Sequence, residues 1–99
     1  MTLTKEKNGN ELTVRLSGEL NTLTAPDLSA LLDSELDSVQ TLTLDFAECD
    51  YVSSAGLRIL LAAFKKMKAA KGTMKLTNVG QNFMEVLQNT GLDGVFDMQ

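Results

Sequence analysis

The sequence predicts an α/β domain built on one mixed β-sheet, which an antiparallel hairpin opens and which helices cover mainly on one face. Residues 1–17 contain two strand-like runs around Asn8-Gly9. Further along, alternating strand patterns are separated by helical ones, and parallel neighbouring strands need such helical crossovers. Each strand alternates polar and apolar residues, whereas a sheet covered on both faces has continuously apolar strands. One face of the sheet is therefore expected to be at least partly wet.

Length and composition favour a single domain over residues 1–99. The chain has 99 residues, of which 43% are hydrophobic and 22% charged, as in ordinary globular proteins. A chain of this size buries enough surface to fold without disulfides or metals. No repeat, linker or low-complexity stretch divides it.

The first element is a hairpin. Residues 11–17 place Leu12, Val14 and Leu16 at alternate positions, and Asn8-Gly9 separates them from the preceding run. Asn-Gly is a strong hairpin signal because a type I′ turn needs positive φ at both central residues. We expect Asn8-Gly9 to form that turn.

The first helix is predicted to begin at Thr24-Ala25-Pro26-Asp27. This segment offers a threonine cap, an acid three residues later and a proline in the first turn. The stripe that follows has the spacing i, i+3, i+4, i+8 and consists of Leu28, Leu31, Leu32 and Leu36. Such a stripe indicates a surface helix that packs by one face.

The remaining elements alternate strand and helix. Residues 41–46 alternate as a strand, and from Gly56 the spacing becomes helical, with Gly72 expected as the glycine stop. The stripe of this helix consists of Leu57, Leu60, Leu61, Phe64 and Met67. Residues 73–78 form another strand, residues 81–90 a short helix ending at Gly91, and Val95 and Phe96 a last short strand or packed tail.

The charge of the chain argues against several partners. The net charge of −4 and pI near 4.6 do not favour nucleic acid or an anionic membrane. Cys49 is the only cysteine, which excludes an internal disulfide and fits a reducing compartment. Residues 1–10 lack an apolar signal core, and nowhere do eighteen apolar residues run together. The sequence predicts a soluble, cytoplasmic protein with no membrane partner.

The chain lacks the residues of common catalytic sites. There is no histidine, which excludes Ser-His-Asp and Cys-His mechanisms, and there is no glycine-rich phosphate loop. A C-x5-R phosphate cradle would need arginine at position 55, where Ala55 stands. Cys49 is therefore interpreted as a small, semi-buried apolar residue. We expect a protein that is not an enzyme and needs no cofactor.

Three acids surround the end of the 41–46 strand: Asp45, Glu48 and Asp50. Carboxylates at this spacing can in principle hold a divalent ion. A solvated loop is the favoured interpretation, because the chain supplies no second group of ligands. No metal site is predicted.

Ser53 and Ser54 stand where the carboxyl end of this strand meets the following helix. In open sheets with βα units, ligands and modifications usually lie at such junctions. One serine is explained as the cap that satisfies an orphan amide of the helix, and we assign this role to Ser53. The pattern alone leaves the role of Ser54 open.

Two motifs carry a resemblance to a known family. The stretch Y-V-S-S-A-G-L-R-I-L-L at 51–61 follows T-L-T-L-D-F at 41–46, and G-E-L-N-T-L-T-A-P-D-L precedes them at 18–28. Together they resemble the STAS domain of bacterial anti-sigma-factor antagonists over the whole chain. The resemblance implies a STAS-like single domain.

The resemblance also implies a regulatory binding protein. Such a protein sequesters an anti-sigma factor with serine kinase activity and so releases a sigma factor for transcription. Phosphorylation of one serine breaks the association, and a PP2C-like serine phosphatase restores it. The motif places the phosphorylated serine at Ser54, with Ser53 as the alternative. The family often has aspartate where Asn21 and Ser53 stand, and serine in place of Ala55.

The surface that the resemblance implies for the partner lies at the same end of the sheet. It comprises Asn21, Thr22, Asp50, Tyr51, Val52, Ser53, Ser54, Ala55, Gly56, Leu57 and Arg58. Within it, Leu57 and Arg58 are expected on an exposed first helical turn. The alternative is a STAS-like sensor that binds a nucleotide or small anion at this helix start and is not phosphorylated. The module is expected to be a monomer or weak homodimer.

Overall fold

The computed structural model describes residues 1–98, which form a five-stranded sheet and three α-helices. The strands are β1 (Thr2–Asn8), β2 (Glu11–Ser17), β3 (Thr41–Glu48), β4 (Thr73–Thr77) and β5 (Asp97–Met98). The helices are α1 (Ala25–Glu35), which continues into the 3-10 turn η1 (Leu36–Ser38), α2 (Ser54–Ala69) and α3 (Gln81–Asn89). The sheet order is β1-β2-β3-β4-β5, and only the β1–β2 pair is antiparallel. The predicted mixed sheet is confirmed.

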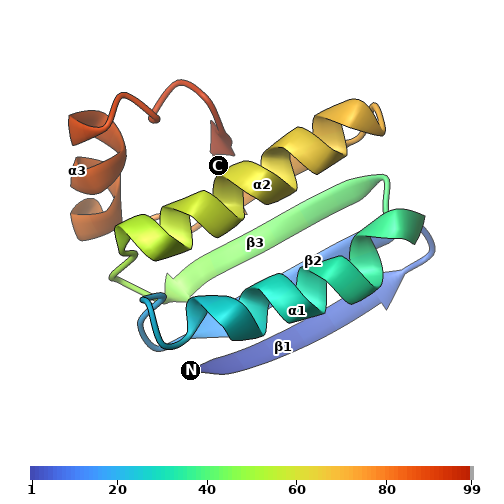
Figure 1. Ribbon diagram of the computed structural model, residues 1–99, viewed down its shortest axis with the longest axis horizontal. Helices are drawn as coiled ribbons and strands as arrows, with labels where there is room; N and C mark the ends of the chain where they lie inside the picture. The colour runs from blue at the N-terminus through green and yellow to red at the C-terminus, as the bar shows by residue number, and fades with distance from the viewer. Residues whose placement is uncertain (99) are drawn as a thin grey trace.

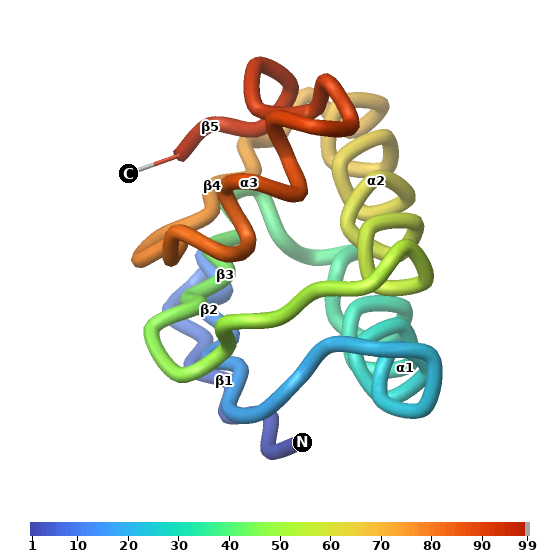
Figure 2. Tube along the Cα trace, turned by 90° about the vertical axis from the view of Figure 1, so that its left-hand side faces the viewer, coloured from blue at the N-terminus to red at the C-terminus, as the bar shows by residue number. Residues whose placement is uncertain are grey.

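Helices α1 and α2 lie side by side on one face of the sheet (Figures 1 and 2). The strands point buried apolar side chains such as Leu12, Leu44 and Leu76 toward them. On the opposite face, the sheet register places Thr13, Thr43 and Lys75 in one row, and these side chains are half-buried. Threonine suits this face because its β-branched side chain fits a pleated surface and its hydroxyl stays hydrated. The predicted covering of mainly one face is confirmed.

The opening hairpin forms, but its turn differs from the prediction. Asn8 pairs with Glu11, so the two central residues are Gly9 and Asn10. Gly9 has φ of +64°, while within residues 1–98 the positive-φ residues other than glycine are Lys71 and Asn78. Positive φ at the first central residue alone is the pattern of a type II′ turn. The type I′ turn at Asn8-Gly9 was wrong, because the register that buries the β2 leucines uses Asn8 as a strand residue.

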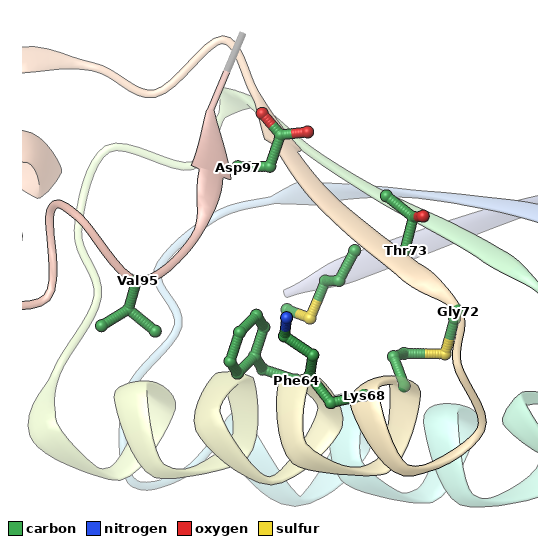
Figure 3. A pocket seen from close by; sticks show the side chains of 8 residues that line it. Phe64, Lys68, Gly72, Thr73, Val95 and Asp97 are labelled. Carbon is green, nitrogen blue, oxygen red and sulfur yellow. The ribbon is translucent and has the colours of Figure 1, made fainter.

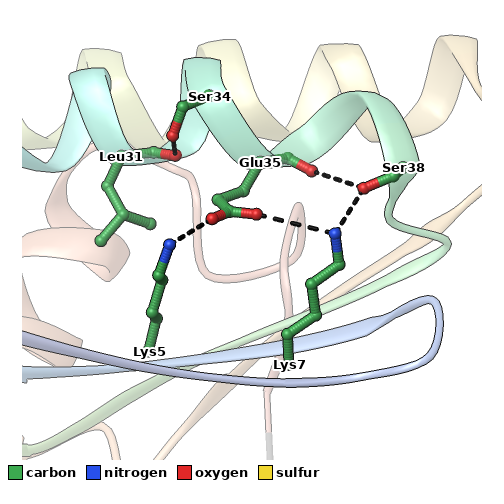
Figure 4. Close-up of polar contacts among 6 residues, drawn as sticks. All are labelled: Lys5, Lys7, Leu31, Ser34, Glu35 and Ser38. Carbon is green, nitrogen blue, oxygen red and sulfur yellow. Dashed lines mark hydrogen bonds and ion pairs between the residues drawn. The ribbon is translucent and has the colours of Figure 1, made fainter.

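Charged side chains attach the hairpin to the end of α1 (Figure 4). Lys5 and Lys7 of β1 both pair with Glu35, and the Lys7 ammonium also donates to the Ser38 hydroxyl at 2.6 Å. The hydrogen bond from Lys5, supported by the charge of Lys7, lowers the pKa of Glu35. Because the pKa is lowered by folding, these contacts stabilise the protein at neutral pH and weaken as the pH falls into the acid range.

The left-handed residue that follows helix α2 is Lys71, one residue before the predicted stop at Gly72. Lys71 adopts the left-handed conformation, with φ of +58°, and the Gly72 amide donates to the Met67 carbonyl at 2.7 Å. This arrangement is a Schellman motif with lysine in place of the usual glycine. Gly72 has a different task, because a Cβ there would lie 2.6 Å from the Gln40 carbonyl oxygen. At the end of α3, the predicted stop at Gly91 is confirmed by its φ of +76°.

Candidate functional site at the start of helix α2

Two loops that are distant in sequence are joined at the carboxyl ends of β2 and β3. Leu20 and Val52 form a parallel β-bridge between them. The Leu20 amide donates to the Tyr51 carbonyl at 2.9 Å, and the Ser53 amide donates to the Leu20 carbonyl at 2.8 Å. The segments containing Asn21 and Ser53 therefore belong to one structural unit, as the predicted partner surface requires.

Ser53 is the cap of α2. Its backbone is extended, with φ of −83° and ψ of 174°, and its hydroxyl oxygen accepts a hydrogen bond from the Gly56 amide at 3.3 Å. This is the geometry by which a side chain satisfies one of the unpaired amides at a helix start. The predicted role of Ser53 as the cap is confirmed.

Ser54 is the first residue of α2, and its side chain is exposed. Within the part of the chain that the structure describes, its hydroxyl makes no hydrogen bond to another protein group. A hydroxyl at this position lies beside free amides and the positive end of the helix dipole. Within residues 1–98, the Ser54 hydroxyl thus has no hydrogen-bonding role in the fold, and it stands in an environment that favours an anion.

The glycine of this motif is required by close packing rather than by its backbone conformation. A Cβ at Gly56 would lie 2.8 Å from Leu20 Cγ and 3.0 Å from Val52 Cγ1, both of which belong to buried side chains. Glycine lowers helix propensity, so its presence here indicates that the close approach matters more. Gly56 lets the start of α2 rest directly on the bridge between the two loops.

Three residues of the predicted partner surface lie inside the domain. Val52 is 1% exposed and Leu57 is 6% exposed, and Gly56 is also buried. The expectation of an exposed Leu57 was wrong, because a helix that starts at Ser54 turns position 57 toward the core. Arg58, by contrast, is exposed as expected.

The turn before α1 also departs from the prediction. Thr24 already has helical φ and ψ, and its hydroxyl makes no capping bond to the helix. That hydroxyl donates instead to the Glu19 carbonyl at 2.6 Å. Asn21 supplies the side-chain acceptor before α1, since its side-chain oxygen accepts hydrogen bonds from the Leu23 and Thr24 amides at 3.0 and 3.1 Å. The predicted capping box of Thr24 and Asp27 was wrong, because the turn begins three residues earlier.

Comparison with known proteins agrees with this architecture. The family model described as "Mlab, STAS domain" matches residues 3–98. The chain belongs to the STAS domain family.

Several relatives of this STAS domain are named as anti-sigma factor antagonists. BtrV of Bordetella bronchiseptica, assigned as an anti-sigma factor antagonist, is 32% identical over 97 residues, which cover 97% of this chain and 84% of BtrV. The crystal structure of an anti-sigma factor antagonist from Mycobacterium paratuberculosis has a TM-score of 0.85 at 28% identity, covering 98% of this chain and 83% of that one. SpoIIAA of Bacillus in its phosphorylated form shares the fold, with a TM-score of 0.79 at 21% identity over 99% of this chain and 91% of that one.

The acids near the serines of this STAS domain do not converge. Asp45 accepts hydrogen bonds from the Asn78 side chain at 2.9 Å and the Ala47 amide at 3.0 Å, and these bonds lower the pKa of its carboxyl. Asp50 accepts from the Asn82 side chain at 2.6 Å, which ties this loop to α3. Among residues 1–98, no three acids, cysteines or histidines come together as metal ligands would. Asp45 and Asp50 hold neighbouring elements in place.

Cys49 of the STAS domain is buried beneath the same loop. Burial raises the pKa of its thiol, which keeps the sulfur protonated at neutral pH. A buried thiol that stays protonated is a poor nucleophile and a poor metal ligand. The side chain fits the interpretation of Cys49 as a small apolar residue.

Two pockets of the STAS domain lie away from Ser53 and Ser54. One of about 240 Å³ lies beneath the far end of α2, where Phe64, Lys68 and Asp97 line it (Figure 3). The other, of about 140 Å³, lies between α1 and α2, with Ser29 and Lys66 among its lining residues. Neither is lined by Ser53 or Ser54, so neither supports a ligand at the start of α2. Within residues 1–98, every helix is too short or too polar to span a bilayer.

Proposed function

We propose that this STAS domain is an anti-sigma factor antagonist whose binding is switched by phosphorylation of Ser54. In this proposal the anti-sigma factor is itself the serine kinase, its capture releases a sigma factor, and a PP2C-like phosphatase reverses the modification. The observation that carries the proposal is the exposed Ser54 hydroxyl at the start of α2, which no protein group engages within residues 1–98. The family and the names of its relatives support the general role.

Ser54 is a better acceptor than Ser53 on geometric grounds. The Ser53 hydroxyl accepts the Gly56 amide, and its backbone amide is bonded to Leu20. A kinase would have to displace the cap before it could reach this half-buried hydroxyl. The Ser54 hydroxyl needs no such rearrangement.

A phosphate on Ser54 is compatible with the folded domain. The dianion would stand at the amino end of a 16-residue helix, where free amides and the helix dipole favour negative charge. The switch must therefore act on the complex rather than on the fold. A phosphate carries close to two negative charges, and it weakens an interface where it loses its water or faces acidic or apolar groups.

Asn21, which stands where relatives often have aspartate, does not weaken the proposal. Its side chain contributes to the turn through its oxygen, which accepts from the Leu23 and Thr24 amides. A carboxylate oxygen makes the same contacts. Asparagine therefore preserves the shape of this surface and removes one negative charge from it.

The test is phosphorylation by the anti-sigma factor kinase of the same organism, followed by intact-mass spectrometry. With ATP, the wild-type domain and Ser53→Ala are expected to gain one phosphate, and Ser54→Ala none. Adding the phosphatase is expected to restore the original mass. Phosphate on Ser54→Ala, or none on the wild type, would contradict the proposal.

Binding supplies a second readout. Ser54→Ala is expected to keep the affinity of the wild type for the kinase, while Ser54→Asp is expected to bind more weakly with an unchanged melting temperature. Thermal shifts with ATP, GTP and phosphate provide the matched control. Stabilisation of the isolated domain by one of these ligands, without kinase binding, would favour a ligand sensor instead.

A further inference from the structure

Leu23 stands out in the turn between β2 and α1, because the residue is 86% exposed. Within residues 1–98, the other large exposed hydrophobic residues are Tyr51, at 48%, and Val95, at 37%. An exposed leucine alone carries little information, because apolar atoms make up much of every protein surface. Leu23 is distinguished by the hydrogen bonds that hold its turn and by the residues that surround it.

The turn that carries Leu23 is fixed by hydrogen bonds on both sides. Asn21 Oδ1 accepts from the Leu23 amide at 3.0 Å, and Thr24 Oγ1 accepts from the Asn21 amide at 2.8 Å. The Thr24 hydroxyl donates to the Glu19 carbonyl at 2.6 Å. The backbone is thus bonded to present Leu23 outward rather than to fold it against the core. An anchor that is already ordered loses little conformational entropy when a partner binds.

Tyr51 lies on the neighbouring loop of the same unit. The Leu20 amide donates to the Tyr51 carbonyl, and the Leu20–Val52 bridge joins the two loops. Two of the three exposed large hydrophobic residues therefore flank the start of α2, where Ser54 is exposed. Tyrosine combines a large apolar body with a polar end and is enriched among the residues that dominate interfaces. Val95, in contrast, lies at the pocket beneath the far end of α2 (Figure 3).

Most charged side chains at this end of the domain are acidic, and within residues 1–98 these acids have no ionic partner. Those acids are Glu19, Asp27, Glu48 and Asp50, and Arg58 is the nearby base. The ion pairs found within residues 1–98 use other acids, whose partners are Lys5, Lys7, Arg15 and Lys66. The lysines at positions 65, 66, 68 and 71 lie toward the opposite end of α2. This acidic surface therefore complements a basic partner. A second copy of this chain is disfavoured as the partner, because its acids would face the same acids and repel them.

We propose that Leu23 is the apolar anchor of the interface with the anti-sigma factor. Together with Tyr51 it inserts into an apolar surface of that protein, which basic side chains border. This inference rests on the proposed function and adds to it the residue that determines affinity. In this arrangement the basic side chains lie at the border, whereas a Ser54 phosphate would lie among the apolar anchors, where it would lose water without gaining a matching contact and so would weaken binding.

The test compares truncation of two exposed apolar side chains, Leu23→Ala and Val95→Ala. Isothermal titration calorimetry with the purified anti-sigma factor kinase of the same organism measures the affinity, and thermal melts check the fold. Leu23→Ala is expected to weaken binding about tenfold or more, as truncation of a central anchor does. Val95→Ala is expected to match the wild type. Raising the salt from about 50 to about 500 mM is expected to weaken wild-type binding, because salt screens attraction between exposed charges.

Each contrary result has a distinct meaning. Equal affinity of Leu23→Ala and the wild type would overturn the anchor while leaving the proposed function in place. A wild-type dimer in light scattering that Leu23→Ala dissolves would also overturn it, because the turn would then bind a second copy. A wild-type domain that neither binds the kinase nor is phosphorylated by it would overturn the proposed function and this inference together, and the wild-type measurements alone reveal that case.

Discussion

Helices α1 and α2 both begin just after a parallel strand ends, yet they use their polar side chains differently. Before α1, Asn21 and Thr24 bond to each other and to the turn, and the exposed apolar residue is Leu23. At α2, Ser53 alone makes the cap, and the exposed residue is Ser54. The Thr24 hydroxyl and the Ser53 hydroxyl are therefore both structural, and the turn at α2 presents a second, free hydroxyl, that of Ser54. Each turn satisfies its own backbone and presents the neighbouring side chain to solvent.

The largest expected effect is at Gly56, which contacts both regions. Gly56→Ala places a Cβ against Leu20 and Val52, and overpacking of this kind costs about 1–3 kcal/mol. We expect the free energy of unfolding to fall by about 2 kcal/mol in urea titrations. Gly94→Ala is the matched control, because no atom lies within 4 Å of its added Cβ. Equal stability of the two variants would show that the turns do not depend on this contact.

The next effect concerns the turn before α1. Thr24→Val keeps the shape of the side chain but removes the hydroxyl that bonds to Glu19 and Asn21. Leaving these backbone groups without their partner is expected to cost about 1.5 kcal/mol of unfolding free energy. Chemical denaturation measures this loss. A change no larger than that of Ser54→Ala would show that the Thr24 hydroxyl is dispensable.

A smaller loss is expected at the cap of α2. Ser53→Ala removes the bond to the Gly56 amide and is expected to lower the unfolding free energy by about 1 kcal/mol. Ser54→Ala, one residue further on, is expected to change it by less than about 0.5 kcal/mol. Urea titrations of the two single variants, done in parallel, give the comparison. A larger loss for Ser54→Ala would reverse the roles assigned to the two serines.

The smallest effect is expected for Asn21→Asp. The carboxylate can accept the same amide bonds, so the unfolding free energy is expected to change by less than about 0.5 kcal/mol. Asn21→Ala, which removes the acceptor, is the control and is expected to destabilise the domain. Thermal melts distinguish the two. If the aspartate variant were as unstable as the alanine variant, the side-chain amide group would have a role beyond its oxygen.

Local patterns predicted the parts of the molecule that depend on local periodicity. The alternating strands, the leucine stripe of α1 and the Ser53 cap all follow from the residue types within one element. Leu57 shows the limit, because its place in the apolar stripe was correct whereas the exposed first turn implied by the family was not. The phosphorylation of Ser54 and the partner surface stay predictions.

Features that depend on distant contacts could not be predicted from the sequence. Gly72 is explained by the carbonyl of Gln40, which belongs to another part of the chain. Asn21 and Thr24 are both typical cap residues. Only the helical backbone of Thr24 shows that the capping side chain before α1 is that of Asn21 and not that of Thr24. Leu23 did leave a signal, since it is an apolar residue in a polar turn and lies outside the leucine stripe that begins at Leu28. That signal identifies an exposed position but not its orientation.

The bridge between Leu20 and Val52 has a consequence for reading mutational screens. Under the proposed function, a reporter of sigma factor activity would score changes at these buried positions and at Leu23 as the same loss of function. The causes would differ, because changes at the bridge are expected to reduce the amount of folded protein in the cell, whereas changes at the exposed Leu23 are expected to leave abundance unaltered. Scoring abundance and activity in parallel would therefore separate the residues that this end of the molecule needs to fold from the residues that contact the partner.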